Sequence, residues 1–238
     1  MGLIEEYFQN KLILVSGVGR GQGLSTVRLL SRFGARVIVI SRHELPGEIQ
    51  SQFKDAQFMM ADVSNEKNVK EMKLKLEENG TRLNGIVNNA GIWEPAAERN
   101  VDPDTLMRFL ISNTMSQYNV IYHLKSLLVE RSSVVNIGAA HSLYRGNGSG
   151  YTISKYAIEE MTRSFASELW KRNIRVNGIL PGSVSKEDIF AKVFPFNFSK
   201  GETPLDPLSI SYITAFLLSP LSYAINGQCI TADRGSDI

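Results

Sequence analysis

Short apolar runs alternate with amphipathic stretches along almost the whole chain. The runs predict strands at 11–15, 36–40, 57–61, 83–87, 133–137, 175–180 and 228–232. Apolar positions recurring every three or four residues predict helices over 24–33, 64–80, 103–128, 151–172 and 207–218. Ser64 and Asp206 are the expected N-caps of the second and the last of these helices. This alternation is typical of an α/β protein, and we expect a Rossmann-type doubly wound parallel sheet of about seven strands with helices on both faces.

Length and composition predict one folded unit. The 238 residues are 43% hydrophobic and 21% charged, and no Pro-, Gly- or Ser-rich linker divides them. We therefore expect a single domain over 1–238. The alternation of strands and helices fails over 183–203, where we expect a loop that covers a substrate. Two interpretations of its phenylalanines stay open, an apolar lining of that site or packing in the core or against another subunit: Phe190, Phe194, Phe196 and Phe198.

Charge and cysteine usage argue against several functional classes. The formal net charge is only +2 and the basic residues are scattered, so neither nucleic acid nor a membrane surface is an expected partner. No leader-like start or long apolar run is present, so a soluble cytoplasmic protein is expected. Cys229 is the only cysteine, and His43, His123 and His141 are far apart in sequence, so no metal site is expected.

A glycine-rich turn lies between the first predicted strand and the first predicted helix. Residues 16–23 read Ser-Gly-Val-Gly-Arg-Gly-Gln-Gly. Glycines in this position permit a tight turn and let the backbone approach a pyrophosphate at the helix N-terminus. The turn therefore predicts a dinucleotide site.

The spacing of Gly17, Gly21 and Gly23 resembles the fingerprint of the short-chain dehydrogenase/reductase family, and further motifs follow in the family's order. These are Asp62-Val63, Asn88-Asn89-Ala90-Gly91, Asn113, the pair Tyr151 and Lys155, Pro181-Gly182 and Asn226-Gly227-Gln228. Asp233-Arg234-Gly235 departs from the family's usual Asp-Gly-Gly. The cofactor-binding residues expected from the turn and this resemblance are Gly17, Gly19, Arg20, Gly21, Gly23, Ser41, Arg42, Asp62, Val63, Asn89, Ala90, Gly91, Tyr151, Lys155, Pro181, Gly182 and Val184.

Residues after the second predicted strand bear on which dinucleotide binds. An acid at this place accepts hydrogen bonds from the ribose of NAD and repels the 2′-phosphate of NADP. Here the chain reads Ser41-Arg42, and Arg20 adds a second cation in the glycine turn. A guanidinium and a hydroxyl suit a phosphate, so NADP(H) is the expected cofactor, the alternative being that both arginines are solvated surface charges.

The resemblance implies hydride transfer between nicotinamide and a carbonyl or alcohol substrate. Tyr151 is the expected general acid, and Lys155, one helical turn later, would lower the pKa of the phenol and hold the nicotinamide ribose. Asn113 would hold a water that links Lys155 to solvent. Family habit favours a 3-oxoacyl reductase and a homotetramer packed through the helices of Asn113 and Tyr151, with a dimer as the alternative. Apolar residues expected at that interface are Ile158, Met161 and Phe165.

The family's catalytic serine is absent from its expected place. Strand alignment puts Ala139 there, whereas counting back from Tyr151 gives Gly138, and neither carries a hydroxyl. Three interpretations stay open: His141 or Ser142 bends in beside Ala139 as a substitute donor, the substrate or a water supplies the polarisation, or the protein binds NADP as a sensor or structural subunit. Losing such a donor typically costs about 10²–10³ in rate.

Overall fold

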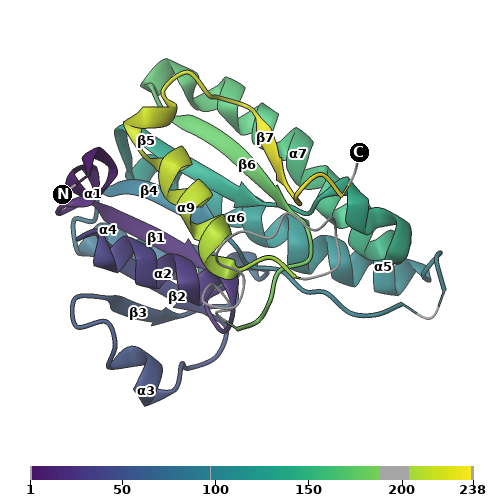
Figure 1. Ribbon diagram of the computed structural model, residues 1–238. Helices are drawn as coiled ribbons and strands as arrows, with labels where there is room; N and C mark the ends of the chain where they lie inside the picture. The colour runs from purple at the N-terminus through teal and green to yellow at the C-terminus, as the bar shows by residue number, and fades with distance from the viewer. Residues whose placement is uncertain (1, 97, 188–203, 237–238) are drawn as a thin grey trace.

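The computed structural model describes residues 2–96, 98–187 and 204–236. Seven parallel strands form one sheet in the order β3-β2-β1-β4-β5-β6-β7, which confirms the predicted fold (Figure 1). The strands are β1 Leu12–Ser16, β2 Arg36–Ser41, β3 Gln57–Met60, β4 Leu83–Asn88, β5 Leu128–Ile137, β6 Arg175–Pro181 and β7 Cys229–Ala232.

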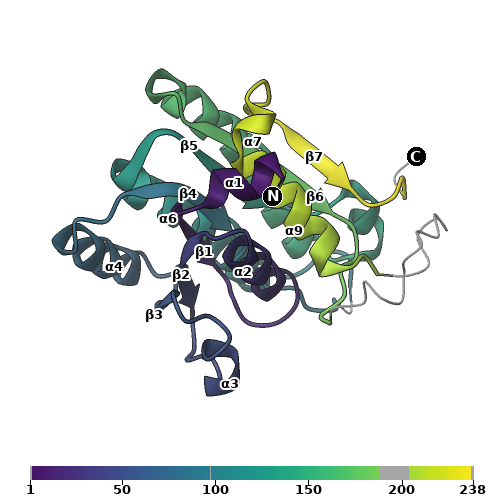
Figure 2. The ribbon, with the colours of Figure 1, turned by 60° about the vertical axis from the view of Figure 1, so that its left-hand side comes forward.

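Helices cover both faces of the sheet. One face carries α1 Leu3–Phe8, α2 Gln22–Arg32 and α9 Pro207–Leu218, and the other carries α4 Glu66–Glu78, α6 Ser116–Leu124 and α7 Ser149–Leu169 (Figure 2). The short helix α3 Gly47–Gln50 projects away from the sheet beyond β2 and β3, and α5 Pro103–Phe109 precedes α6. This arrangement has three layers, helix on sheet on helix.

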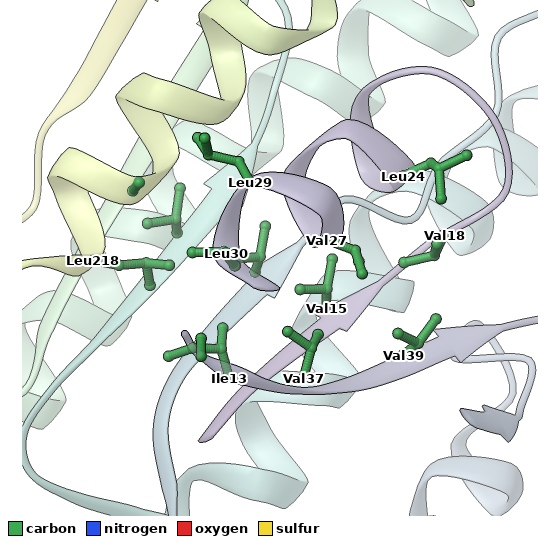
Figure 3. Packing of buried hydrophobic residues seen from close by; sticks show 14 of the residues in the cluster. Ile13, Val15, Val18, Leu24, Val27, Leu29, Leu30, Val37, Val39 and Leu218 are labelled. Atoms are coloured by element: carbon green, nitrogen blue, oxygen red, sulfur yellow. The ribbon is translucent and has the colours of Figure 1, made fainter. Parts of the chain in front are cut away.

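Alternating strand residues build two cores, one on each face. Ile13 and Val15 of β1 pack with Val27 and Leu30 of α2 (Figure 3). Leu14 between them points to the opposite core, which α4, α6 and α7 cover. Burying each side chain of this kind contributes about 1.5–3 kcal/mol to the stability of the fold. The sheet is therefore a rigid support for the residues at the ends of its strands. Strands buried on both faces explain the near-continuous apolar runs in the sequence.

The long helix predicted over 103–128 is interrupted. It comprises α5, a π-helical segment at Leu110–Met115, α6, and a 3-10 turn at Lys125–Leu127. Asn113 lies inside the π-helical segment, where its side chain bonds other parts of the chain. Such contacts join residues distant in sequence, so helical periodicity does not reveal the widened turn.

Strand β5 begins five residues before its predicted start. Leu128 pairs with Leu83, but Glu130 and Arg131 are exposed and the register shifts between Leu83 and Gly85. Arg131 adopts a positive φ of 64° at this irregularity. The exposed charges break the apolar run, which explains why the sequence pattern shows only the buried half of the strand.

Other differences are smaller. The N-cap of α4 is Asn65, whose side chain accepts from Lys67 N, whereas the predicted cap Ser64 donates its hydroxyl to Asp62. The predicted cap of α9, Asp206, accepts from Leu208 N, as expected. The helices α1 and α3 were not predicted because they are too short to show periodicity.

The expected interface residues lie inside the protein. Ile158, Met161 and Phe165 on α7 are 0%, 7% and 4% exposed, and all three belong to the core under α4 and α6. The expectation that they serve a subunit interface is therefore wrong, because α7 turns this apolar stripe toward the sheet.

The segment after β6 is described only at its two ends. Val184 and Leu205 form an isolated parallel bridge, supported by the bond from Ser185 N to Leu205 O at 2.9 Å. Residues 188–203, with the four phenylalanines of the expected substrate loop, lie outside the described residues.

Within the described ranges, no helix is both long enough and apolar enough to cross a membrane.

Candidate functional site

The strand order reverses at β1, which pairs with β2 on one side and β4 on the other. Ligands of open α/β sheets bind beyond the carboxyl ends of the strands at such a point. Gly17 directly follows β1 with a φ of 70°, and a Cβ on it would overlap backbone atoms of Ala90, which follows β4. Only glycine lets these two chain segments approach so closely.

A cavity of about 260 Å³, here named cavity A, opens at these strand ends. It brings together these residues expected to bind cofactor: Gly17, Gly19, Ser41, Arg42, Asp62, Val63, Ala90 and Gly91. Ser41 donates its hydroxyl to His43 O at 2.8 Å, and Asp62 accepts from the backbone and hydroxyl of Ser64. These bonds fix the polar groups at the ends of β2 and β3.

The two arginines differ in position. Arg42 lines cavity A, is exposed, and lies with its Nε 3.3 Å from Nε2 of His43. Glu44 lines the same cavity. Arg20 is exposed and lines neither this cavity nor its neighbour, so the structure does not bring the two guanidinium groups together around one space.

A second cavity of about 520 Å³, here named cavity B, shares Gly91 and Ile92 with cavity A. Its lining includes further residues that were predicted: Asn89, Tyr151, Lys155, Pro181, Gly182 and Val184. Gly21 and Gly23 lie behind the lining, Gly23 being packed against Asn89, whose Nδ2 donates to Gly17 O at 2.8 Å. The two cavities thus adjoin at Gly91 and Ile92, and together they form a cleft along the carboxyl ends of β1 to β6.

Sequence reasoning missed several residues of cavity B. Gln22, Trp93, Asn147 and Lys186 line it, from the start of α2, the segment after β4, the residue before α7's cap and the segment after β6. Their sequence neighbourhoods carry no motif for such a role. Only the position of Gln22 inside the glycine turn could have pointed to it.

Tyr151 and Lys155 both face cavity B from α7, and Asn113 lies behind them. Lys155 Nζ donates to Ile137 O at 3.2 Å, at the end of β5. Asn113 Oδ1 accepts from Ile92 N at 2.6 Å. A Cβ on Gly91 would lie 2.8 Å from Asn113 Oδ1 and 3.2 Å from Lys155 Nζ, so this glycine allows the three segments to meet.

Ser154 connects Asn113 to α7. Asn113 Nδ2 donates to Ser154 Oγ at 2.9 Å, and that hydroxyl donates to Tyr151 O at 2.8 Å. Both Asn113 and Ser154 are fully buried, so these bonds are shielded from water. The π-helical segment is thereby locked to the helix that carries Tyr151 and Lys155.

Burial perturbs both titratable groups at the site. Desolvation raises the pKa of Tyr151 to about 12, which is opposite to the lowering expected from the charge of Lys155. Desolvation also lowers the pKa of Lys155 to about 8, because within the described parts of the chain no carboxylate offsets the cost of a buried ammonium. At neutral pH the phenol therefore keeps its proton.

The position expected to carry a serine can be assigned from packing. Ala139 is 1% exposed and clusters with Phe109 and Tyr151, whereas a Cβ on Gly138 would meet Leu180 Cδ2 at 2.5 Å. Of the two sequence registers, Ala139 is therefore the one beside the phenol ring. The packing around that ring is apolar at this point.

His141 and Ser142, which were expected to replace the missing serine, do not point toward Tyr151. His141 Nε2 lies 2.7 Å from Glu159 Oε1, and the imidazole packs against the rings of Tyr144 and Tyr156. Ser142 donates to Asp233 Oδ2 at 2.7 Å. Neither residue lines cavity A or cavity B. Both begin the 3-10 turn His141–Gly146 that follows β5, and both are held by partners outside the two cavities.

Comparisons with known proteins agree with this geometry. The profile of the enoyl-(acyl carrier protein) reductase family matches residues 17–237. Short-chain dehydrogenase reductase 3c of Arabidopsis thaliana is 29% identical, over 95% of this chain and 94% of its own. A 3-oxoacyl-(acyl-carrier-protein) reductase of Thermotoga maritima is 26% identical, over 95% of this chain and 98% of its own.

A solved structure shares the fold. The short chain dehydrogenase of Leptospira borgpetersenii serovar Hardjo-bovis, determined with bound NAD+, superposes with a TM-score of 0.83 at 22% identity, covering 100% of this chain and 97% of that one. The chain belongs to the short-chain dehydrogenase/reductase family, whose members are oxidoreductases that use NAD or NADP.

Proposed function

We propose that the protein is an NADP(H)-dependent oxidoreductase that interconverts a carbonyl substrate and its alcohol. The observation that carries this proposal is that Tyr151 and Lys155 line one cavity, which adjoins at Gly91 and Ile92 the cavity that the glycine turn lines. A dinucleotide lying along this cleft would have its nicotinamide beside the phenol and its adenosine beyond β2 and β3.

The residues along the cleft fit a dinucleotide. Gly19 lines cavity A, and a Cβ on it would meet no atom within 4 Å, so the turn leaves open space in front of α2. The N-terminus of α2 favours the negative pyrophosphate. Gln22 Nε2 is buried at cavity B and has no hydrogen-bond partner among the described residues, so a bound cofactor would supply the missing acceptor.

The bound nicotinamide would supply or accept the hydride, and the protein has to manage the proton. In the direction of reduction, Tyr151 donates its phenolic proton to the substrate oxygen. Its raised pKa keeps that proton in place until the oxygen gains negative charge. Lys155 holds the ribose hydroxyls and stabilises the phenolate that remains. Asn113 fixes Ile92 and Ser154 around this pair and is proposed to hold a relay water.

NADP(H) is proposed over NAD(H) on the side chains at the end of β2. Ser41 and Arg42 line cavity A, where the adenosine ribose would lie, and a guanidinium pairs with a 2′-phosphate through charge-assisted hydrogen bonds. Arg20 is exposed on the turn before α2 and lines neither cavity, so Arg42 carries this part of the proposal. Glu44 at the same cavity favours the opposite choice, so relative affinity for NADPH and NADH is the direct measurement.

A homotetramer is proposed as the assembly, with a dimer as the alternative. In place of the buried α7 stripe, large apolar side chains are exposed along α5, the π-helical segment and α6, and on α7: Met107, Ile111, Met115, Tyr118, Tyr122, Ile153 and Tyr156. Helix faces of this kind suit contact with a second copy. Light scattering of the purified protein tests it, and a monomer at micromolar concentration would contradict it.

A 3-oxoacyl compound is the proposed substrate class. The decisive experiment measures NADPH oxidation over a panel of carbonyl compounds, with NADH alongside and Tyr151→Phe as the control. Turnover that Tyr151→Phe abolishes supports the enzyme.

The alternative is an NADP-binding sensor or structural subunit, which the apolar Ala139 beside Tyr151 favours. In that case NADPH binds tightly, but neither wild type nor Tyr151→Phe turns over any member of the panel.

A further inference from the structure

A side-chain pair bridges the mouth of cavity B. Trp93 Nε1 donates to Asn147 Oδ1 at 2.6 Å, which joins the segment after β4 to the segment before α7. Both residues line the cavity, together with Tyr151, and the Trp93 side chain is 57% exposed. A contact between residues 54 positions apart, at the rim of the candidate active site, fixes the geometry of that rim.

The bridge orients the amide of Asn147. Its oxygen accepts from Trp93, and its nitrogen donates one hydrogen to Leu143 O at 2.6 Å. An amide nitrogen carries two hydrogens, and the second has no acceptor within the described parts of the chain. Asn147 therefore offers a held donor at the wall of cavity B, four residues before Tyr151 on the same side of the cleft.

The other polar groups near Ala139 are occupied. Tyr144 donates its hydroxyl to Ala139 O at 3.0 Å, His141 pairs with Glu159, and Ser142 donates to Asp233. None of these three residues lines cavity B, whereas Asn147 does. Asn147 is thus the polar residue of the turn before α7 that presents a free amide hydrogen to the cavity that Tyr151 lines.

We propose that the Asn147 side-chain amide donates a hydrogen bond to the reacting oxygen of the substrate, with Trp93 as its positioning residue. The inference rests on the proposed carbonyl reduction. Hydride adds to the carbonyl carbon, the C=O π pair moves to oxygen, and Tyr151 delivers the proton, so an alcohol and oxidised cofactor form. Asn147 keeps both its hydrogens and stabilises the charge that develops on that oxygen.

Single substitutions at Asn147 and Trp93 test the hydrogen-bond donor and its positioning residue separately. Asn147→Ala removes the donor, and Asn147→Asp removes it while keeping an acceptor for Trp93 Nε1. Each is expected to lower kcat/KM by about 10²–10³, with NADPH affinity unchanged. Trp93→Phe keeps an aromatic ring but loses the indole N–H that bonds Asn147 Oδ1 and orients the amide. A drop in kcat/KM of about tenfold is expected.

A second substitution can show whether Asn147 donates a hydrogen bond to the substrate or only stabilises the turn before α7. Ala139→Ser in the Asn147→Ala background places a hydroxyl beside Tyr151 and is expected to recover at least about tenfold in kcat/KM. A turn weakened by loss of the bond to Leu143 O gains nothing from that hydroxyl.

Trp93 also supplies a readout that needs no turnover. The chain has 2 tryptophans, so Trp170→Phe leaves Trp93 as the only one. Its emission is expected to change when a carbonyl substrate is added to the NADP+ complex, because the substrate reaches the amide to which its indole is bonded. Asn147→Ala in this background is expected to abolish the change.

The outcomes are distinguishable. If wild type turns over no carbonyl compound, the proposed function fails and this inference fails with it. If wild type is active but Asn147→Ala retains its kcat/KM, only the inference is overturned. Loss of activity without rescue by Ala139→Ser, and with Trp93 emission insensitive to substrate, also overturns it, since Asn147 then only supports the turn.

Discussion

Lys155 Nζ lies 3.2 Å from Ile137 O, so the ammonium of α7 bonds the last carbonyl of strand β5. The same carbonyl accepts from Gln117 Nε2 at 2.9 Å, from α6. One backbone oxygen thus joins three elements, and it holds a cation that burial destabilises. The arrangement points the lysine into cavity B at a cost to the stability of the fold.

Lys155→Met is expected to stabilise the protein at neutral pH. Burial lowers the pKa of Lys155 from 10.5 to about 8, so the unfolded chain binds more protons between those values and wild-type stability rises with pH across that window. The penalty is complete below pH 8, at about 3 kcal/mol, and it fades by about pH 10.5. Urea unfolding at pH 7 and pH 10 measures the difference.

The exposed Lys67, whose side chain is 83% accessible, provides the control for that measurement. Lys67→Met is expected to leave the free energy of unfolding nearly unchanged at both pH values. A Lys155→Met variant no more stable than wild type at pH 7 would contradict the desolvation argument.

Gly17→Ala and Gly19→Ala are expected to fail in different ways. Alanine at Gly17 takes a positive φ and overlaps Ala90, so the fold loses several kcal/mol, on the order of 2–4. The Cβ of an alanine at position 19 would meet no protein atom within 4 Å, so the melting temperature is expected to equal that of wild type. The methyl group would occupy part of cavity A, so NADPH affinity is expected to fall about tenfold or more. Calorimetry and NADPH titration test the pair, and equal melting temperatures for both variants would contradict the packing argument.

Arg42→Ala is expected to weaken NADPH binding by about 10–100-fold, while NADH binding stays within about twofold. The reason is that a charge-assisted bond to a 2′-phosphate contributes about 1.5–3 kcal/mol, and NADH lacks that phosphate. Arg82→Ala, at an exposed position near the other end of the sheet, is the matched control. Parallel loss of both cofactors would mean that Arg42 supports the local fold instead.

Ala139→Ser in the otherwise native protein is expected to raise kcat/KM for a carbonyl substrate, by up to about tenfold. The new hydroxyl would join an existing donor instead of replacing a lost one. Ala140→Ser places the same hydroxyl on the neighbouring residue, which does not belong to the cluster around Tyr151, and no gain is expected from it. A gain from Ala140→Ser would contradict the assigned register.

Short sequence motifs were enough to predict those parts of the candidate site whose residues lie close together in the sequence. The glycine turn, the strand that precedes it and the spacing of Tyr151 and Lys155 are all local, and the structure places them on one cleft. Helix caps such as Asp206 are equally local and were predicted correctly. These features need only the dihedral and spacing preferences of short segments.

Features that depend on distant contacts were not predictable in this way. The bond from Trp93 to Asn147 spans 54 positions, and the π-helical turn at Asn113 is stabilised by Ile92 and Ser154. The interface prediction at Phe165 failed for a related reason, because an apolar stripe on a helix does not say which neighbour covers it.

The bridge between Val184 and Leu205 joins the segment after β6 to the segment before α9. Ser185 N donates to Leu205 O and Leu205 N to Ser183 O, so these two segments are held together at one point. Val184 and Lys186 on one side of this point line cavity B, and Leu205 on the other side leads into α9. A substitution at this point is therefore expected to affect the wall of the cavity and the start of α9 together.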